Sequence, residues 1–394
     1  MNMRRWCLLC LVIGGSLILL GAVLRPTFQA LGRTPTDRVV ENPTDDGGWS
    51  ALGTGVDGQV RAIAISGNDV YVGGMFNSAG NCTTGCNNIA KWNTVTQSWS
   101  ALGLGVDGQV QAIAIYDGQV YVGGDFANAG PVAAKRIAKW DGSGWWSLNE
   151  GVNGTVHAIV VSDGTVYVGG EFTQAGGCTG ASHGCYFVAV WNSPGWGPLS
   201  LGTDSYVQAL ADGGVHVYVG GIFGSAGNVP HTPNIALWDK PGWYPVDNGT
   251  NGAVNALVVQ GDDVYAGGLF SQAGGVPVTN IAKWNSVSGW SALGAGVGDN
   301  AMIRTIAVGG NDVYVGGDFK DNDNGVPNHI AKWNSTSGWS ALGSGTNSKV
   351  YALAITGSEI YVGGSFTSAG GKDAHGIAKY SIASYKVYLP VVIK

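Results

Sequence analysis

A seven-residue string that recurs along most of the chain constrains the fold more than any other feature. Its first copy is Val-Tyr-Val-Gly-Gly-Met-Phe at residues 70–76. The tyrosine of the string recurs at Tyr71, Tyr121, Tyr167, Tyr218, Tyr265, Tyr314 and Tyr361, a mean spacing of about 48 residues. A fixed period of this length indicates an array of equivalent units that shield each other's apolar faces.

Each repeat contains four short apolar runs, which in the first repeat are residues 60–65, 70–76, 89–92 and 98–103. The runs are rich in Val, Ile, Tyr and Trp and are bounded by Gly, Asn, Asp or Ser, so they predict strands. Turn residues between the first two runs favour a tight hairpin, and the four strands should form an antiparallel meander. Because apolar residues in these strands do not alternate with polar ones, each sheet has two apolar faces. Both faces must therefore be covered.

Seven such sheets packed face to face around an axis satisfy that need, so we expect an all-β, seven-bladed β-propeller over residues 49–380. A Trp-Ser-Ala-Leu-Gly segment at residues 49–53 precedes the first full repeat, and the last repeat ends without one. The N-terminal segment should therefore complete the last blade and remove an open edge. The strand-like C-terminal tail, residues 381–394, is a competing partner for that edge, but Trp49 favours the N-terminal segment.

The order of apolar run, VYVGG, IAKWN and WSALG resembles the kelch and galactose-oxidase type of propeller. It is closer still to secreted or surface propellers of the fungal cortical polarity-marker and delta-60 repeat type. One residue separates Tyr71 from Gly73, where the kelch pattern has two. The resemblance implies the fold and no particular activity, because relatives on this scaffold differ in function.

The N-terminus and the composition restrict location and partners. Arg4 and Arg5 precede an uncharged run over residues 6–24, so residues 1–25 read as a signal peptide or a membrane anchor, followed by a linker over 26–48. We therefore expect an extracellular or cell-surface protein, a monomer that meets a membrane only through this segment. Charged residues are 12% of the chain and the net charge is −6, which argues against nucleic acid as a partner.

The cysteines predict two local disulfides, Cys82 with Cys86 and Cys178 with Cys185, each in a loop between second and third strands. A metal site needs about four ligands and each pair supplies two, so we assign no metal. Calcium stays open as a minor alternative at residues 321–325, although Lys332 stands where a calcium loop has Glu.

Fifteen tryptophans could form a sugar-binding surface, but their fixed places in the repeat favour packing between blades. Six of them end third strands. The residues expected to start the fourth strands are Trp49, Trp99, Trp146, Trp196, Trp243, Trp290 and Trp339.

One position varies inside the otherwise constant repeat, the second residue of the innermost strand, and every residue there can form hydrogen bonds. The seven are Arg61, Gln111, His157, Gln208, Asn255, Arg304 and Tyr351. Since the position lies at the start of the inner strand, they should surround one mouth of the central channel, where a ligand would bind. The competing interpretation is that they only hydrate a narrow channel.

Three acidic residues that follow the glycine pair, Asp125, Glu171 and Asp318, should lie on the same face. We expect them to pair with Arg61, Arg304 or loop amides. We assign no catalytic residue and no cofactor, and expect a non-catalytic binding module for a protein or carbohydrate partner. The alternative is an extracellular carbohydrate-active enzyme that acts at the same mouth.

Overall fold

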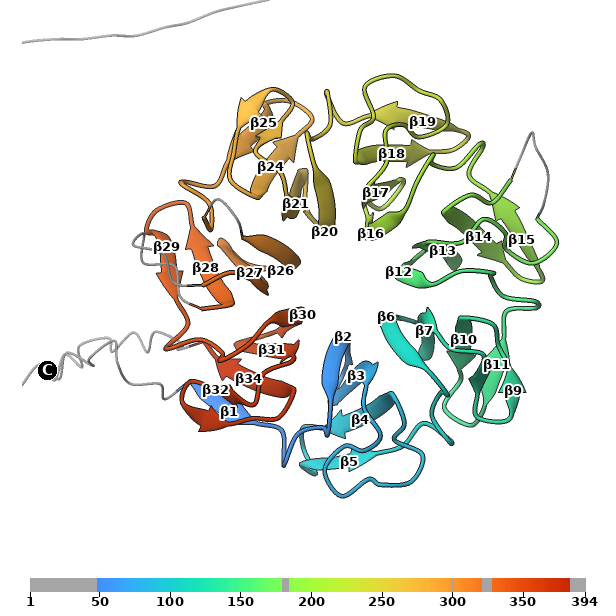
Figure 1. Ribbon diagram of the computed structural model, residues 1–394, viewed down its shortest axis with the longest axis vertical. Helices are drawn as coiled ribbons and strands as arrows, with labels where there is room; N and C mark the ends of the chain where they lie inside the picture. Colours follow the sequence, from blue (N-terminus) through green and yellow to red (C-terminus); the bar gives the residue numbers. More distant parts are fainter. Residues whose placement is uncertain (1–47, 179–183, 299–300, 321–327, 383–394) are drawn as a thin grey trace, which may run out of the picture. The chain divides into compact units, whose positions relative to one another are not determined.

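Seven four-stranded antiparallel sheets surround a central axis (Figure 1). The computed structural model describes residues 48–178, 184–298, 301–320 and 328–382, all within the compact unit Pro43–Lys394. The protein is an all-β, seven-bladed β-propeller, as the repeat predicts. The predicted export segment, nearly all of the linker and the tail from residue 383 lie outside the described residues. No helix in the described ranges is long and apolar enough to cross a membrane.

In six blades the strands run outward from the axis in chain order, and in the last blade the outermost strand is the N-terminal strand. The inner strands are β2 (Gln59–Ser66), β6 (Gln109–Tyr116), β12 (Val156–Ser162), β16 (Val207–Asp212), β20 (Ala253–Gln260), β26 (Met302–Gly309) and β30 (Val350–Thr356). The second strands are β3 (Asp69–Met75), β7 (Gln119–Asp125), β13 (Thr165–Gly170), β17 (Val217–Gly221), β21 (Asp263–Leu269), β27 (Asp312–Asp318) and β31 (Glu359–Gly364).

The outer half of each blade is built the same way. The third strands are β4 (Ile89–Asn93), β10 (Ile137–Trp140), β14 (Val188–Asn192), β18 (Ile235–Asp239), β24 (Ile281–Asn285), β28 (Ile330–Asn334) and β34 (Ile377–Ser381). The outermost strands are β5 (Ser98–Ser100), β11 (Trp145–Ser147), β15 (Gly195–Pro198), β19 (Gly242–Pro245), β25 (Gly289–Ala292), β29 (Gly338–Ala341) and β1 (Trp49–Ala51). Small hairpins in the loops are formed by β8 (Asn128–Ala129) with β9 (Val132–Ala133), β22 (Gln272–Ala273) with β23 (Val276–Pro277), and β32 (Ser368–Ala369) with β33 (Lys372–Asp373).

The ring is closed by the N-terminal strand, as predicted, although β1 is shorter than the expected 49–53. It pairs antiparallel with β34, with Trp49 opposite Tyr380, and Figure 1 shows it in blue beside the red strands of the last blade. The rings of Trp49 and Tyr380 meet edge to face at 5.2 Å between centroids. Two segments that are more than 300 residues apart in the sequence therefore share one sheet.

A tryptophan of each outermost strand ties its blade to the preceding one through an indole N–H···O=C hydrogen bond. The seven bonds are Trp49 to Leu342, Trp99 to Leu52, Trp145 to Leu102, Trp196 to Leu148, Trp243 to Leu199, Trp290 to Val246 and Trp339 to Leu293, all between 2.9 and 3.2 Å. The packing role expected from the repeat is thus seen in every blade.

The assignment of Trp146 to this set is wrong, because Trp145 occupies the position in the second blade. Trp145 is 6% exposed and lies opposite Trp140, whereas Trp146 is 57% exposed and bonds to the carboxylate of Asp141. Two adjacent tryptophans in a period-two strand point to opposite faces, and only one can enter the core. In the other blades this tryptophan stands three residues before a Leu or Val, the same spacing as from Trp145 to Leu148, which would have selected the right one.

The two glycines of the repeated string make room for different neighbours. A Cβ on Gly73 would overlap the side chain of Val110 in the next blade, and one on Gly363 would overlap Val60, across the ring closure. A Cβ on Gly74 would instead overlap the carbonyl oxygen of Gln59, in the paired inner strand. The first glycine therefore permits close packing of blades, and the second permits a local distortion of the inner strand.

Candidate functional site

Each inner strand contains a β-bulge, and the bulge falls at the variable position of the repeat. Val60 pairs with Gly74 and Ala62 pairs with Gly73, so Arg61 is left without a partner in the register. The same shift surrounds Gln111, His157, Gln208, Asn255, Arg304 and Tyr351. A bulge bends the strand and redirects a side chain, which gives all seven residues the same placement.

The seven bulge residues line one cavity of about 170 Å³ at the channel mouth. All seven are half-buried, and none is acidic. The start of each inner strand lies beside the end of the second strand, so the mouth opens on the face that carries the loops between second and third strands. The structure therefore brings together every residue that the sequence placed at this mouth, and a binding role for them stays a prediction.

One arc of the mouth is cationic. The guanidinium carbons of Arg61 and Arg304 lie 4.9 and 5.4 Å from the ring centroid of Tyr351, within the range of cation–π contacts. The three residues come from blades one, six and seven, which are neighbours across the ring closure. Arg61 Nη2 donates to Gln59 Oε1 at 3.3 Å, while the buried Nε atoms of both arginines have no hydrogen-bond partner among the described residues.

Burial lowers the pKa of Arg61, and the neighbouring positive charge of Arg304 lowers it further, against the opposing influence of Tyr351. Desolvation disfavours a charged group, and a second like charge adds to that cost. An arginine stays protonated under these conditions because its intrinsic pKa is so high. The arc therefore holds two charges whose mutual repulsion is not offset by an ion pair with any described residue.

The remaining arc contains no arginine or lysine and is partly engaged within the protein. His157 Nε2 lies 2.9 Å from Glu171 Oε1, in the same blade. Asn255 Nδ2 donates to the carbonyl oxygen of Ile303 at 3.2 Å, which links neighbouring inner strands. The mouth is therefore polarised, with its cations on one side and an imidazole–carboxylate pair elsewhere.

Of the partners expected for the three acidic residues, which were Arg61, Arg304 or loop amides, the two arginines are wrong. Asp125 lies 3.4 Å from Arg136, Asp318 lies 2.6 Å from Lys349, and Glu171 meets His157. The physical reason is register. Each acid follows the glycine pair and lies opposite the residue before the bulge, as Asp125 does with Gln109, which places it on the rim. Among the three, Glu171 reaches a cavity side chain, that of His157.

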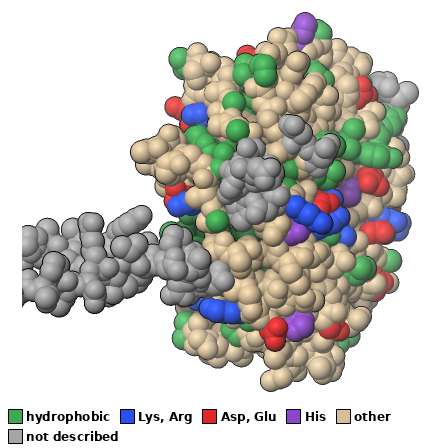
Figure 2. Space-filling view, turned by 60° about the vertical axis from the view of Figure 1, so that its left-hand side comes forward, with side chains coloured by type: hydrophobic (Ala, Val, Ile, Leu, Met, Phe, Trp, Pro, Cys, Tyr) green, Lys and Arg blue, Asp and Glu red, His purple; other side chains and the backbone are tan. Residues whose placement is uncertain are grey.

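Sequence reasoning missed the apolar side chains on this rim. The residue after the glycine pair is Met75 in blade one, Ile222 in blade four and Leu269 in blade five, and these side chains are 51%, 49% and 45% exposed. Tyr206, 42% exposed, lies beside Phe187 on the same side of blade four. The alignment of the seven repeats would have shown this alternation of charged and apolar residues. Elsewhere, Figure 2 shows charged side chains scattered among uncharged ones.

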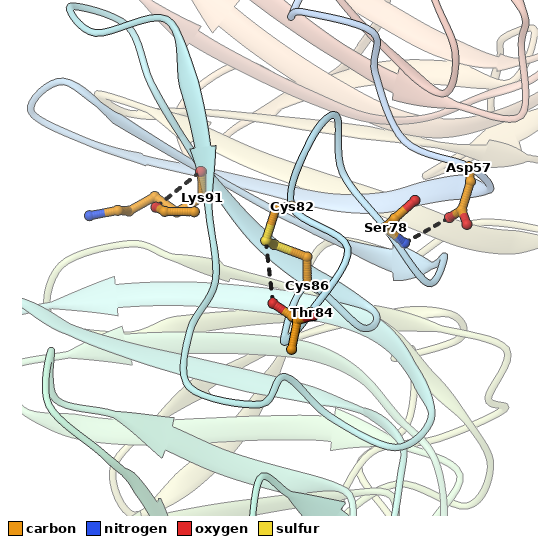
Figure 3. The surroundings of a disulfide bond; sticks show 7 residues. Asp57, Ser78, Cys82, Thr84, Cys86 and Lys91 are labelled. Atoms are coloured by element: carbon orange, nitrogen blue, oxygen red, sulfur yellow. Dashed lines mark hydrogen bonds between the residues drawn. A yellow bond between two sulfur atoms is a disulfide. The ribbon is translucent and has the colours of Figure 1, made fainter.

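Both predicted disulfides are present. Cys82 bonds to Cys86 and Cys178 to Cys185, with Cα atoms 5.9 Å apart in each pair. Figure 3 shows the first of them closing its loop, with Cys82 near the carbonyl oxygen of Thr84. The possible calcium segment, residues 321–325, lies outside the described residues. Within the described ranges no group of three or more His, Cys, Asp or Glu side chains could hold a metal ion.

No known protein family and no curated protein matches the chain. Solved structures do match it. YCF48 bound to D1 peptide is 11% identical with a TM-score of 0.54, covering 87% of this chain and 97% of that one. The WD40 β-propeller domain of Doa1 is 13% identical with a TM-score of 0.54, covering 84% and 96%. A chain of the mitotic checkpoint complex is 15% identical with a TM-score of 0.52, covering 85% and 94%.

At these identities the similarity shows the β-propeller fold alone. The closer relationship to kelch-type or polarity-marker propellers stays a prediction.

Proposed function

We propose that this protein is an exported, non-catalytic binding propeller whose partner docks on the face around the channel mouth. The observation that carries this proposal is the convergence of seven different polar side chains, one from each blade, on a single cavity. The apolar positions of the repeated strands are nearly constant because packing between blades requires them. A site that varies while its backbone geometry is kept is suited to recognition.

The preferred partner is a protein segment. Exposed Ile222 and Leu269 on neighbouring blades, with Met75 further round, place apolar side chains beside a polar centre. Apolar residues next to hydrogen-bonding groups are characteristic of protein interfaces. One structure of similar fold, YCF48, was solved with a peptide bound, which supports the same use of the scaffold here.

Export is supported by two observations. Disulfides persist in oxidising compartments, and the structure has two of them. The uncharged run that follows Arg4 and Arg5 has the pattern of an export signal. Kinship with secreted kelch-like and polarity-marker propellers is part of this proposal, and the order of the repeated motifs supports it.

The test is a binding screen of the full chain against immobilised peptide and oligosaccharide libraries. A double variant, Gln111→Ala with Gln208→Ala, removes two cavity amides and leaves both arginines in place. We expect peptide ligands whose binding weakens at least several-fold in this variant and in Ile222→Ser. If both variants bind the ligand as tightly as wild type, the channel mouth is not the binding site. If only oligosaccharides bind, the partner is a carbohydrate and not a protein. Turnover of any sugar would favour the alternative function, a carbohydrate-active enzyme.

A further inference from the structure

We propose that the cationic arc of the channel mouth, formed by Arg61, Arg304 and Tyr351, binds an oxyanion group, a carboxylate, sulfate or phosphate, on the ligand. This inference rests on the proposed function and identifies the chemistry that the same cavity recognises. It begins from a charge imbalance. Two guanidinium groups converge on one aromatic ring, and neither forms an ion pair with any described residue.

Such an arrangement is unfavourable in the free protein. The Arg61 guanidinium loses part of its hydration, and the like charge of Arg304 nearby adds to that cost. The buried Nε–H groups of Arg61 and Arg304 also lack acceptors among the described residues. A buried donor without an acceptor costs free energy. An anion bound in the cavity beside the two arginines would offset their positive charge and accept hydrogen bonds from guanidinium N–H groups.

The rest of the cavity suits an anion as well. None of its seven lining side chains is acidic, and the amides of Gln111, Gln208 and Asn255 can all donate. A guanidinium presents a planar set of donors that matches an oxyanion in bidentate geometry. Contact with the Tyr351 ring restricts both arginine side chains before the ligand arrives, which lowers the entropy cost of binding.

The cavity volume, about 170 Å³, accommodates a small oxyanion group together with water. The bulk of the ligand would then lie on the rim, where the apolar side chains are exposed. The acids of the rim do not compete for the arginines, because Asp125, Asp318 and Glu171 contact Arg136, Lys349 and His157 instead. The geometry thus separates an anion-binding centre from a neutralised edge.

The experiment measures binding of sodium acetate, sulfate and phosphate to the full chain by calorimetry and thermal shift, with sodium chloride at equal ionic strength as the reference. The variants are Arg61→Gln, Arg304→Gln and, as the matched control, Arg136→Gln, whose guanidinium pairs with Asp125 outside the cavity. We expect wild type and the control to bind at least one of the three anions. Each cavity variant should bind on the order of tenfold more weakly.

The three salts distinguish a carboxylate from a tetrahedral anion as the preferred group. Arg61→Lys keeps the positive charge but loses the planar guanidinium donors. It should bind the anion with an affinity between those of wild type and Arg61→Gln. It also replaces Arg61→Gln if that variant does not fold. Equal responses from wild type, the cavity variants and the control would mean a general salt effect and would overturn the inference, as would no response from wild type.

Failure here is separable from failure of the proposed function. If no oxyanion binds but a library peptide still requires Gln111 and Gln208, the anion inference is wrong and the mouth remains the binding site. If the library ligand ignores those residues as well, both proposals are wrong. If an oxyanion binds through the arginines, both are supported.

Discussion

The indole N–H of Trp49 donates a 2.9 Å hydrogen bond to the carbonyl oxygen of Leu342, although the two residues are 293 positions apart. Trp49 belongs to the strand that completes blade seven, and Leu342 follows the outermost strand of blade six. The indole is 1% exposed. The bond is the same one that joins every other pair of neighbouring blades, so the closure of the ring reproduces the ordinary contact between repeats.

Trp49→Ala should therefore destabilise the whole propeller. The substitution removes a fully buried ring, its contact with Tyr380 and the bond to Leu342. Losses of about 3–5 kcal/mol are typical for such truncations. Equilibrium unfolding in urea measures the change. Deletion of residues 385–394 provides the comparison and should cost much less; a larger cost for the tail would mean that the tail closes the ring.

The adjacent pair Trp145 and Trp146 provides a test with its own internal control. Trp145→Ala should cost about 3–5 kcal/mol because its ring is buried and bonded to Leu102. Trp146→Ala should change the free energy of unfolding by about 0.5 kcal/mol or less, since that side chain is mostly exposed. Near-ultraviolet circular dichroism and urea titration report both effects. Similar costs for the two variants would contradict the assignment of the blade contact.

Gly74→Ala should disturb the bulge that carries Arg61. The added methyl group overlaps the carbonyl of Gln59, a backbone atom that cannot rotate away. We expect destabilisation of about 1–3 kcal/mol, together with weaker oxyanion binding at the mouth. Gly144→Ala is the matched control, because no atom lies within 4 Å of a Cβ added there, and its effect should be within about 0.5 kcal/mol. An intact affinity in Gly74→Ala would mean that the bulge does not position Arg61.

The acid sensitivity of the protein should depend on Asp57 and its repeat equivalent Asp107. Asp57 Oδ1 accepts the backbone N–H groups of Asn77 and Ser78 at 2.7 and 2.9 Å, the second of which Figure 3 shows. Burial by itself would raise the pKa of this carboxyl, but these hydrogen bonds outweigh it and hold the pKa below 3.8. The stabilisation is thus present above that value and is lost as the pH falls through the lower folded pKa.

Asp57→Asn with Asp107→Asn removes this titration and keeps an acceptor oxygen. The chain itself uses asparagine at this position, where Asn153 Oδ1 accepts the N–H groups of Thr173 and Gln174. We expect little change in the urea midpoint near pH 7 and a smaller fall than in wild type on going to about pH 3. Equal falls in the two proteins would show that other carboxylates govern acid unfolding. Lys283→Ala, which breaks a different ion pair with Asp263, is a control for general loss of charge.

Much of the site was visible in the sequence, and the exceptions have physical causes. Arg61 and its six equivalents could be placed at one mouth because a period of known phase fixes which end of each strand they occupy. Their partners could not be placed. Asp125 and Asp318 reach Arg136 and Lys349 through loops and neighbouring blades, and the local pattern around an acid says nothing about which cation lies beside it.

The sequence by itself determined the number of blades, the order of strands, the disulfides and the strand that closes the ring. The blades, the strand order and the closing strand follow from repetition, since a motif that cannot shield its own faces must stack on copies of itself. The disulfides follow from the positions of the cysteines in two short loops. Only the tertiary structure showed that Trp145 and not Trp146 enters the core, that the variable residue is a bulge, and that Arg61 and Arg304 share Tyr351. Those facts depend on strand register and on side chains that meet across blades, and a one-residue difference in register exchanges the inner and outer faces of a strand.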